Sequence, residues 1–346
     1  HTRWVSDWSS DVCSSDLDRL LARVSANQVV LDRACTLLTE AVQAKRRLTP
    51  AGEWLLDNIY LIEEQIAIAR RHLPRGYSQE LAQLDQGPSR GLPRVYDIVL
   101  HAIAHGDGRV DAESLSRYVA AYQSVAPLSM GELWAIPIML RLALIENLRR
   151  VAERLIVDRG SRNLADLWSD RLTQAAEVDP KSMVLVIADM ARSHPPATSP
   201  FVAELARRLQ GRSAYLAMPL TWVEQWLAES EQSIEQMVHA ENQQQAAAQV
   251  SISNSIGSLR FLATLDWREF VETMSLVDRT LREDPVDVYG RMDFATRDHY
   301  RHIVERIARR GRLSEHQVAS QVLELARDGA ARAGAQAQDA LDAHVG

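Results

Sequence analysis

The fold is decided by one long stretch of chain, which reads Gly131-Glu-Leu-Trp-Ala-Ile-Pro-Ile-Met-Leu-Arg-Leu-Ala-Leu-Ile-Glu-Asn-Leu-Arg-Arg150. Its apolar residues recur at the spacing of an amphipathic helix and cover more than one face. Ser129 can cap the first turn, and Glu132 three residues later completes a capping box. We therefore predict a long helix from Ser129 to about Arg159, buried on several sides, with a kink where Pro137 removes a hydrogen-bond donor.

The same helical period continues in both directions from this stretch. Thr49 and Pro50 form a helix start signal, and the helix that they begin is predicted to reach about Arg71. Almost no segment shows the alternation that is typical of strands. The predicted fold class is all-α: a multi-helix array of packed antiparallel helical hairpins with no substantial sheet. Further helices are expected over residues 94–105, 111–124, 163–177, 181–193, 200–209, 220–251, 267–281, 294–309 and 314–341, with a turn at 251–258.

Composition and charge narrow the class of protein. The 346 residues include 46% hydrophobic and 25% charged side chains, which is ordinary for a globular chain with a core large enough for two packed units. The formal net charge of -7 argues against a nucleic-acid partner, which would favour clustered Lys and Arg. Cys13 and Cys35 are the two cysteines, so the sequence offers neither a disulfide framework nor a multi-cysteine zinc site.

The chain is predicted to fall into three parts. Residues 1–17 have no helical or strand period and resemble translated sequencing adapter, so we expect them to be non-native. A first helical subdomain is expected over residues 18–160 and a second over 161–346, the latter truncated before membrane and transferase regions. The longest apolar run, residues 133–144, is shorter than the roughly 20 residues that cross a bilayer, so we expect this chain itself to be soluble.

The sequence lacks the motifs of several common enzyme classes. It contains no P-loop, no dinucleotide-binding glycine fingerprint, no Gly-x-Ser-x-Gly elbow and no His-Glu-x-x-His helix. His101 and His105 have the spacing of two metal ligands, but the sequence supplies no convincing further ligand beside them. We therefore predict no catalytic residue, no cofactor and no metal in this chain.

Paired carboxylates leave one enzymatic alternative open, because two Asp or Glu side chains at a suitable separation can hydrolyse glycosides. A structural role in a first helical turn is the stronger interpretation of Glu53 and Glu132. Aromatic side chains can stack on sugar rings, but on an apolar helix they more often belong to the core. The candidate carboxylates are Glu53, Asp57, Glu63, Glu64, Glu132 and Glu146, and the candidate aromatic residues are Trp54, Tyr60, Tyr96 and Trp134.

A mixed-charge motif, Asp293-Phe-Ala-Thr-Arg-Asp298, contains more polar residues than covering a simple core requires. Asp293 can cap a helix that begins near Ala295. Arg297 and Arg301 can form bidentate bonds with carboxylates of another segment. We interpret this motif mainly as a docking element, with direct ligand contact as the alternative.

Four motifs, in this order along the chain, resemble the N-terminal region of bacterial cyclic β-1,2-glucan synthases of the glycosyltransferase family 84 type. The resemblance extends from about residue 48 to the end and is patchy between residues 160 and 286. It implies a large multi-pass inner-membrane protein that joins a UDP-glucose-dependent glucosyltransferase, which uses a divalent metal, to a cyclising part and a phosphorylase-like part. The motifs are Glu53-Trp-Leu-Leu-Asp-Asn-Ile-Tyr60, Gly91-Leu-Pro-Arg-Val-Tyr96, Gly131-Glu-Leu-Trp-Ala-Ile-Pro-Ile-Met-Leu-Arg141 and Asp293-Phe-Ala-Thr-Arg-Asp298.

For this chain the resemblance implies a non-catalytic helical region on the cytoplasmic side of the bacterial inner membrane, which organises the transferase. The implied partners are the transferase and membrane regions of the same polypeptide and a β-1,2-glucan chain, with no nucleic acid. An independent all-α interaction module and a helical carbohydrate-active domain with a carboxylate pair remain alternatives. The residues expected to contact a docking partner or glucan are Glu53, Trp54, Asn58, Tyr60, Arg94, Tyr96, Glu132, Trp134, Asp293, Arg297 and Asp298.

Overall fold

The structure, a computed structural model, describes residues 19–73 and 77–345, and the segment that we expect to be non-native lies outside them. Within the described part the chain is helical, with one isolated antiparallel bridge between Gln83 and Pro93. The all-α fold class is therefore confirmed. The elements are α1 (Arg19–Gln43), α2 (Pro50–Asp57), α3 (Ile59–His72), α4 (Tyr77–Glu80), α5 (Arg94–His105), α6 (Ala112–Gln123), α7 (Met130–Val178), η1 (Pro180–Ser182), α8 (Met183–Arg192), α9 (Ser199–Leu209), η2 (Ala214–Leu216), α10 (Ala217–Ala228), α11 (Ile234–Phe261), α12 (Trp267–Met274), α13 (Leu276–Leu281), α14 (Val288–Arg291), α15 (Phe294–Arg310) and α16 (Glu315–Val345).

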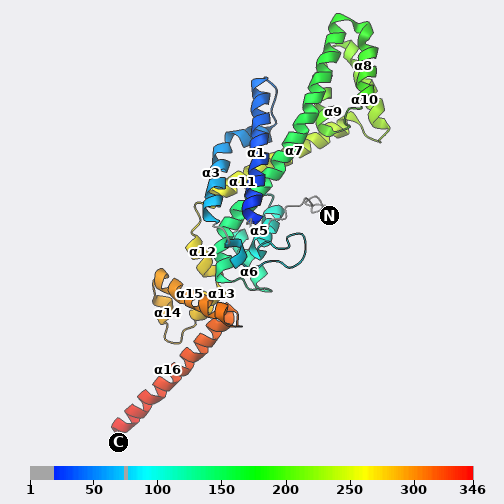
Figure 1. The fold of residues 1–346 in the computed structure, drawn as a ribbon. Coiled ribbons are helices and arrows are strands. Elements are labelled where there is room, and N and C mark those ends of the chain that lie inside the picture. The colour runs from blue at the N-terminus through cyan, green and yellow to red at the C-terminus, as the bar shows by residue number, and fades with distance from the viewer. Residues whose placement is uncertain (1–18, 74–76, 346) are drawn as a thin grey trace.

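Helix α7 is the axis of the molecule (Figure 1). The predicted capping box is present, because the Ser129 hydroxyl accepts from the backbone N–H of Glu132 while the Glu132 carboxylate accepts from the backbone N–H of Ser129. The helix continues to Val178, beyond the predicted end near Arg159. Gly160 costs about 1 kcal/mol in a helix interior, and the apolar residues buried on both sides of it outweigh that cost.

The predicted helix over residues 50–71 is wrong in one respect, because it is interrupted at Asn58. Helix α2 ends at Asp57 and α3 begins at Ile59. The Asn58 side-chain amide donates to the carbonyl oxygen of Trp54, and its oxygen accepts from Arg260 of α11 at 2.7 Å. A side chain that bonds to nearby backbone competes with helical hydrogen bonding, and the contact with a distant helix holds this break in place.

The predicted helix over residues 220–251 and the turn at 251–258 are also wrong. Helix α10 ends at Ala228, and α11 begins after a capping box of Ser233 and Gln236 and runs through the predicted turn to Phe261. The serines that suggested a turn lie on the buried face of α11. Ser258 donates to the carbonyl oxygen of Gly108, and Asn147 of α7 donates to Ser255 at 2.9 Å. Their hydroxyls are satisfied by the helix itself and by its neighbours, so the helix continues.

Two further predicted helices differ from the structure in their limits. The predicted helix over residues 267–281 is divided into α12 and α13, because the Ser275 hydroxyl accepts from the backbone N–H of Asp278 and starts a new helix. The predicted helix over residues 163–177 is the C-terminal part of α7.

Buried apolar residues form two clusters. The main core joins α1, α2, α3, α5 and α6 to the N-terminal part of α7 and to parts of α11 through α16. The arm core joins the C-terminal part of α7 to α8, α9, α10 and the start of α11. Helices α7 and α11 contact each other and belong to both clusters. The arm extends from one end of the elongated molecule, and α16 extends from the other (Figure 1). The predicted division at residue 160 stays a prediction.

In the described part of the chain, no helix combines the length and the apolar character that crossing a membrane requires.

Candidate functional site

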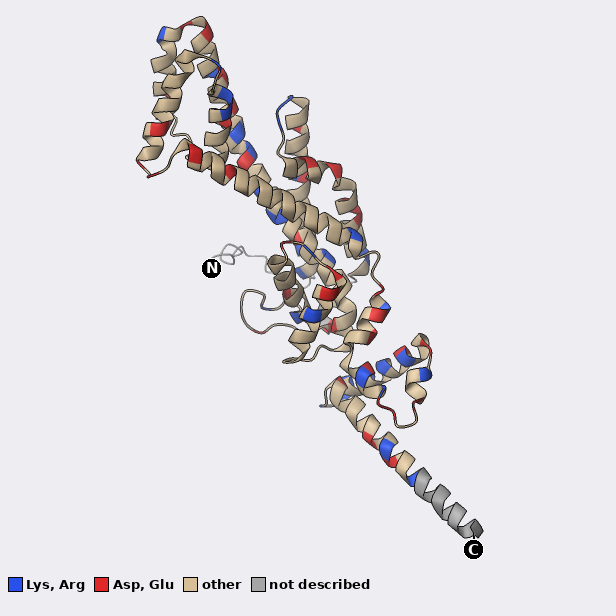
Figure 2. Ribbon diagram, turned by 180° about the vertical axis from the view of Figure 1, so that it is seen from behind, with Lys and Arg blue, Asp and Glu red and all other residues tan. Residues whose placement is uncertain are grey.

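The mixed-charge motif lies where α12, α13 and α15 meet. Asp293 accepts from the backbone N–H of Thr296 and caps α15, as predicted, although the helix begins at Phe294. Arg297 and Arg301 are one turn apart on this helix and therefore share a face. Charged residues of both signs gather on the helices next to α16 (Figure 2).

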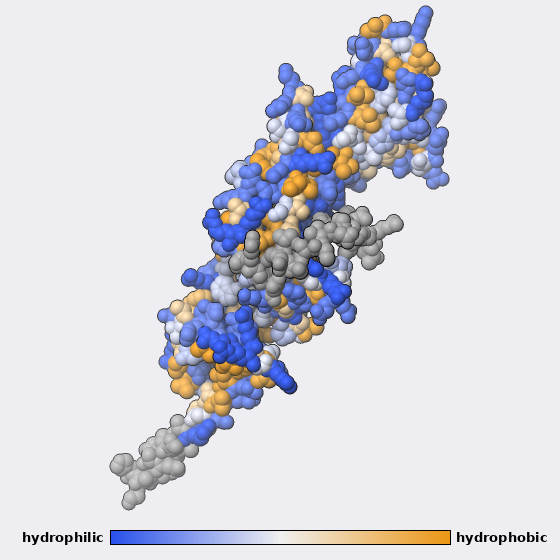
Figure 3. All heavy atoms as spheres, in the orientation of Figure 1, coloured by the Kyte–Doolittle hydropathy of each residue, from blue (hydrophilic) through white to orange (hydrophobic). Residues whose placement is uncertain are grey.

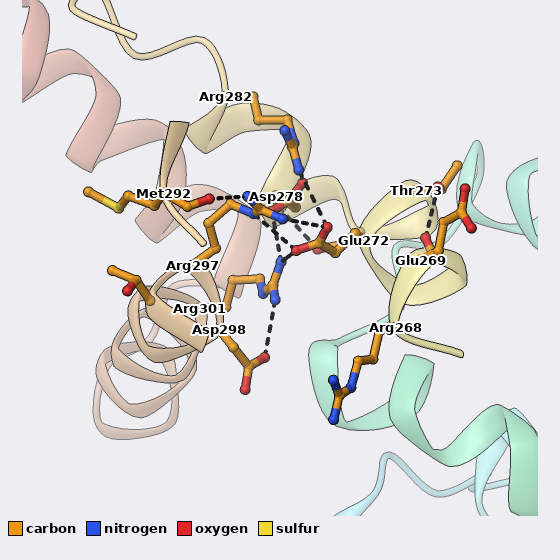
Figure 4. Close-up of polar contacts among 12 residues, drawn as sticks. Arg268, Glu269, Glu272, Thr273, Asp278, Arg282, Met292, Arg297, Asp298 and Arg301 are labelled. Carbon is orange, nitrogen blue, oxygen red and sulfur yellow. Dashed lines mark hydrogen bonds and ion pairs between the residues drawn. The ribbon is translucent and has the colours of Figure 1, made fainter. Parts of the chain in front are cut away.

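Arg297 forms the predicted bidentate bond with a carboxylate of another segment. Its Nε lies 3.0 Å from Oε1 of Glu272, and its Nη2 lies 2.9 Å from Oε2. Its Nη1 also donates to the carbonyl oxygen of Met292. The fork geometry of the guanidinium fixes the orientation of α15 against α12 (Figure 4).

Arg301 is the centre of this site and is only 1% exposed. Its Nη1 donates to Glu272 and to Asp278, each at 2.8 Å, and its Nη2 donates to Asp298 at 3.2 Å. Arg282 donates to the other oxygen of Asp278 at 2.6 Å. Three arginines thus face three carboxylates, and we call these residues the ionic cluster: Glu272, Asp278, Arg282, Arg297, Asp298 and Arg301.

The electrostatics of the ionic cluster favour its charged form. Burial opposes ionisation of Glu272, but hydrogen bonds from Arg297 and Arg301 outweigh burial and hold the pKa of this carboxyl below its usual value. The Tyr289 hydroxyl donates to Asp278 at 2.9 Å, and burial together with that carboxylate raises the pKa of the tyrosine. Near neutral pH the Glu272 carboxylate therefore stays ionised and the Tyr289 hydroxyl stays protonated, so both keep their hydrogen bonds.

A second pair of expected site residues meets at the start of α7. Arg94, the first residue of α5, holds Glu132 through two bonds of 2.9 and 2.6 Å, and Glu132 is only 1% exposed. Because Glu132 also accepts from Ser129, this carboxylate is committed to a cap and a buried ion pair. Next to it, Glu315 of α16 accepts from the backbone N–H of Met130 at 2.7 Å. The first turn of α7 therefore binds both α5 and α16.

The remaining expected residues do not gather into one site. Glu53 lies in the first turn of α2, while Trp54 and Tyr60 are 38% and 64% exposed. Tyr96 is buried, and Trp134 is partly buried against the main core. Sequence reasoning missed Glu272, Asp278 and Arg282, although acidic residues among the apolar positions of α12 and α13 were a signal that a cationic partner is near.

Other candidate groups have structural partners. Glu146 accepts from Asn27 at 2.8 Å and forms ion pairs with Arg23 and Arg149. His101 Nδ1 lies 2.9 Å from the carbonyl oxygen of Asp97. Over residues 19–73 and 77–345, the structure shows no group of His, Cys, Asp or Glu that could hold a metal ion.

The fold and the site define an all-helical region whose charged side chains bind one another across helix junctions. No protein-family model matches this chain. Cyclic beta-(1,2)-glucan synthase NdvB of Rhizobium meliloti (strain 1021) is 33% identical to it over 316 residues, which are 91% of this chain and 11% of that protein. The resemblance drawn from the four motifs is confirmed: the chain is related to a region of a cyclic β-(1,2)-glucan synthase. It spans about a ninth of the length of that relative.

Proposed function

We propose that this chain is a non-catalytic helical region of a membrane-bound cyclic β-1,2-glucan synthase, and that it organises the UDP-glucose-dependent glucosyltransferase of the same polypeptide. In this proposal UDP-glucose and a divalent metal bind the transferase region, and the chain lies on the cytoplasmic side of the bacterial inner membrane. Its partners are the transferase and membrane regions.

One observation supports this proposal above the carbohydrate-active alternative. Among the candidate carboxylates, Glu132 is bound by Arg94, and Glu146 forms ion pairs with Arg23 and Arg149; Glu272 of the ionic cluster is bound by Arg297 and Arg301. The hydrogen bonds from Arg297 and Arg301 hold the pKa of the Glu272 carboxyl below its usual value, which makes this group a poor general acid. These residues hold α5, α7, α12 and α15 in a fixed arrangement, which suits a surface on which another region packs.

The test compares activity with assembly in the full-length synthase. We expect Glu132→Gln to lower the amount of folded synthase in the membrane while the glucan made from UDP-glucose per folded molecule stays within about twofold of wild type. Separately expressed transferase region should co-purify with this chain, and a chain carrying Arg301→Met should lose that association.

Three outcomes would contradict the proposal. A loss of about a hundredfold or more per folded molecule in Glu132→Gln would assign that carboxylate to the chemistry. Hydrolysis or rearrangement of β-1,2-glucan by the isolated chain, lost in Glu53→Gln, would support the carbohydrate-active alternative. Specific capture of a partner in cells that make no glucan synthase, without association with the transferase region, would support the independent interaction module.

A further inference from the structure

A pocket opens on the arm between α8 and α10, away from the ionic cluster. It has a volume of about 400 Å³. This size lies within the range of about 300–1,000 Å³ that is typical of small-ligand sites. Figure 3 shows hydrophobic residues exposed near the end of the arm. The lining residues are Val184, Ile187, Met218, Thr221, Trp222 and Gln225.

The sequence of α10 builds one wall of this pocket. Val223 and Leu227 face the arm core and are buried, and Trp222 and Trp226 pack against the same core while remaining partly exposed. Met218, Trp222 and Trp226 recur at four-residue spacing and therefore share one stripe of the helix. The rings of the two tryptophans are nearly parallel, at 13°, with centroids 5.6 Å apart. The two rings are stacked, and Trp222 lines the pocket.

Two uncharged polar side chains, Thr221 and Gln225, line the pocket together with Trp222. The Thr221 hydroxyl donates to the carbonyl oxygen of Ala217 at 3.1 Å, which leaves its oxygen able to accept. Gln225 is exposed and brings an amide with both donors and an acceptor. The lining contains no Lys, Arg, Asp or Glu.

This chemistry selects among classes of ligand. A phosphate or an anionic headgroup would call for a cationic partner, and this lining provides none. A glucose ring has an apolar C–H face that fits an aromatic ring, and hydroxyl groups at its edge that fit an amide and a hydroxyl. An uncharged sugar therefore matches both the charge and the shape of the lining.

We propose that this pocket binds an uncharged β-glucan chain, with Trp222 stacked on one glucose ring and Thr221 and Gln225 bonded to its hydroxyls. The proposal rests on the proposed function, because the related protein is named for β-(1,2)-glucan. The site holds the product chain against the arm and leaves its chemistry to another region.

The test titrates linear β-1,2-gluco-oligosaccharides into the purified 346-residue chain and follows binding by calorimetry and tryptophan fluorescence. We expect saturable binding that Trp222→Ala weakens by about tenfold, the loss of one stacking contact. Tyr118→Ala is the control, because Tyr118 is an exposed aromatic residue on α6 that does not line the pocket, and it should leave the affinity unchanged. Gln225→Ala and Thr221→Val change exposed side chains without disturbing the arm core, and each should weaken binding severalfold.

Absence of binding would overturn the site, as would equal affinity in wild type, Trp222→Ala and Gln225→Ala. Binding of uncharged phosphatidylcholine vesicles or of an apolar helical peptide, without binding of the oligosaccharide, would assign the groove to those partners and would also overturn it. The proposed function is tested separately, through association with the transferase region. A chain that retains this association but binds no glucan would disprove only the pocket assignment.

Discussion

At the scale of single residues, Arg301 joins three helices through one guanidinium. It contacts Glu272 of α12, Asp278 of α13 and Asp298 of its own helix. Burying a charge is costly unless it is paired, so the contribution of each charged side chain to stability depends on the presence of the others. Removing one partner therefore does more harm than the loss of a single contact.

We expect Arg301→Met to lower the free energy of unfolding by about 3–5 kcal/mol, because the buried carboxylate of Asp278 and the partly buried carboxylate of Glu272 would each lose a cationic partner. Arg306→Met is the matched control on the same helix, since Arg306 is exposed, and it should change stability by less than about 0.5 kcal/mol. Urea unfolding followed by circular dichroism measures both variants. Equal stabilities of the two would show that the ionic cluster does not hold these helices.

The pH dependence of stability should show the effect of the lowered pKa of Glu272. Its pKa is depressed below the usual 4.5, so its contribution is fully present above pH 4.5 and is lost as the pH falls through the lower pKa of the folded state. Wild type should therefore lose more stability than Glu272→Gln between pH 6 and about pH 3. Urea midpoints across this range test the sign, and a larger acid loss in the variant would contradict it.

At the scale of elements, local signals set the helix starts and distant contacts set the interruptions. Ser129 with Glu132, Thr49 and Asp293 could be recognised because a cap and its helix lie within four residues of each other. The break at Asn58 and the continuity of α11 past Ser258 depend on partners far away along the chain. Arg297 was recognised because it lies in the motif that Asp293 caps. Its partner Glu272 was not, because it lies 25 residues away along the chain.

Alanine substitutions at two glycines should change the stability of the protein in opposite directions. Gly160 lies within α7, and an added Cβ would meet nothing within 4 Å, so Gly160→Ala should stabilise the protein by about 0.5–1 kcal/mol. Gly108 has φ +82°, and an added Cβ would lie 2.3 Å from the Ser255 hydroxyl of α11. Gly108→Ala should therefore destabilise the protein by at least about 1 kcal/mol. Thermal unfolding of both variants tests this, and a shift in the same direction would contradict it.

At the scale of the whole molecule, the buried apolar residues form two clusters, the main core and the arm core. Phe201 of α9 is fully buried in the arm core, and α9 packs against α7 and α11. Sequence periodicity identified α8 and α9 but joined α10 to α11, and it could not show that the chain returns to the main core along α11, because that return is a matter of tertiary packing.

We expect Phe201→Ala to cost about 3–5 kcal/mol within the arm. Amide hydrogen exchange should rise across α8, α9 and α10 while α1 and α5 keep their protection, because their apolar contacts lie in the main core. Leu144→Ala in the main core is the matched variant, and it should raise exchange in α1 and α5. Uniform loss of protection in both variants would show that the molecule opens as one unit.

The two helices shared by both cores also have a mechanical consequence. Helices α7 and α11 contact each other and both continue from the main core into the arm. The arm is therefore attached to the main core through two packed helices. Such an attachment resists bending more strongly than a single helix does. A load that tilts the far end of the arm is therefore transmitted along α7 to its capped first turn, where Arg94 and Glu315 tie it to the neighbouring helices.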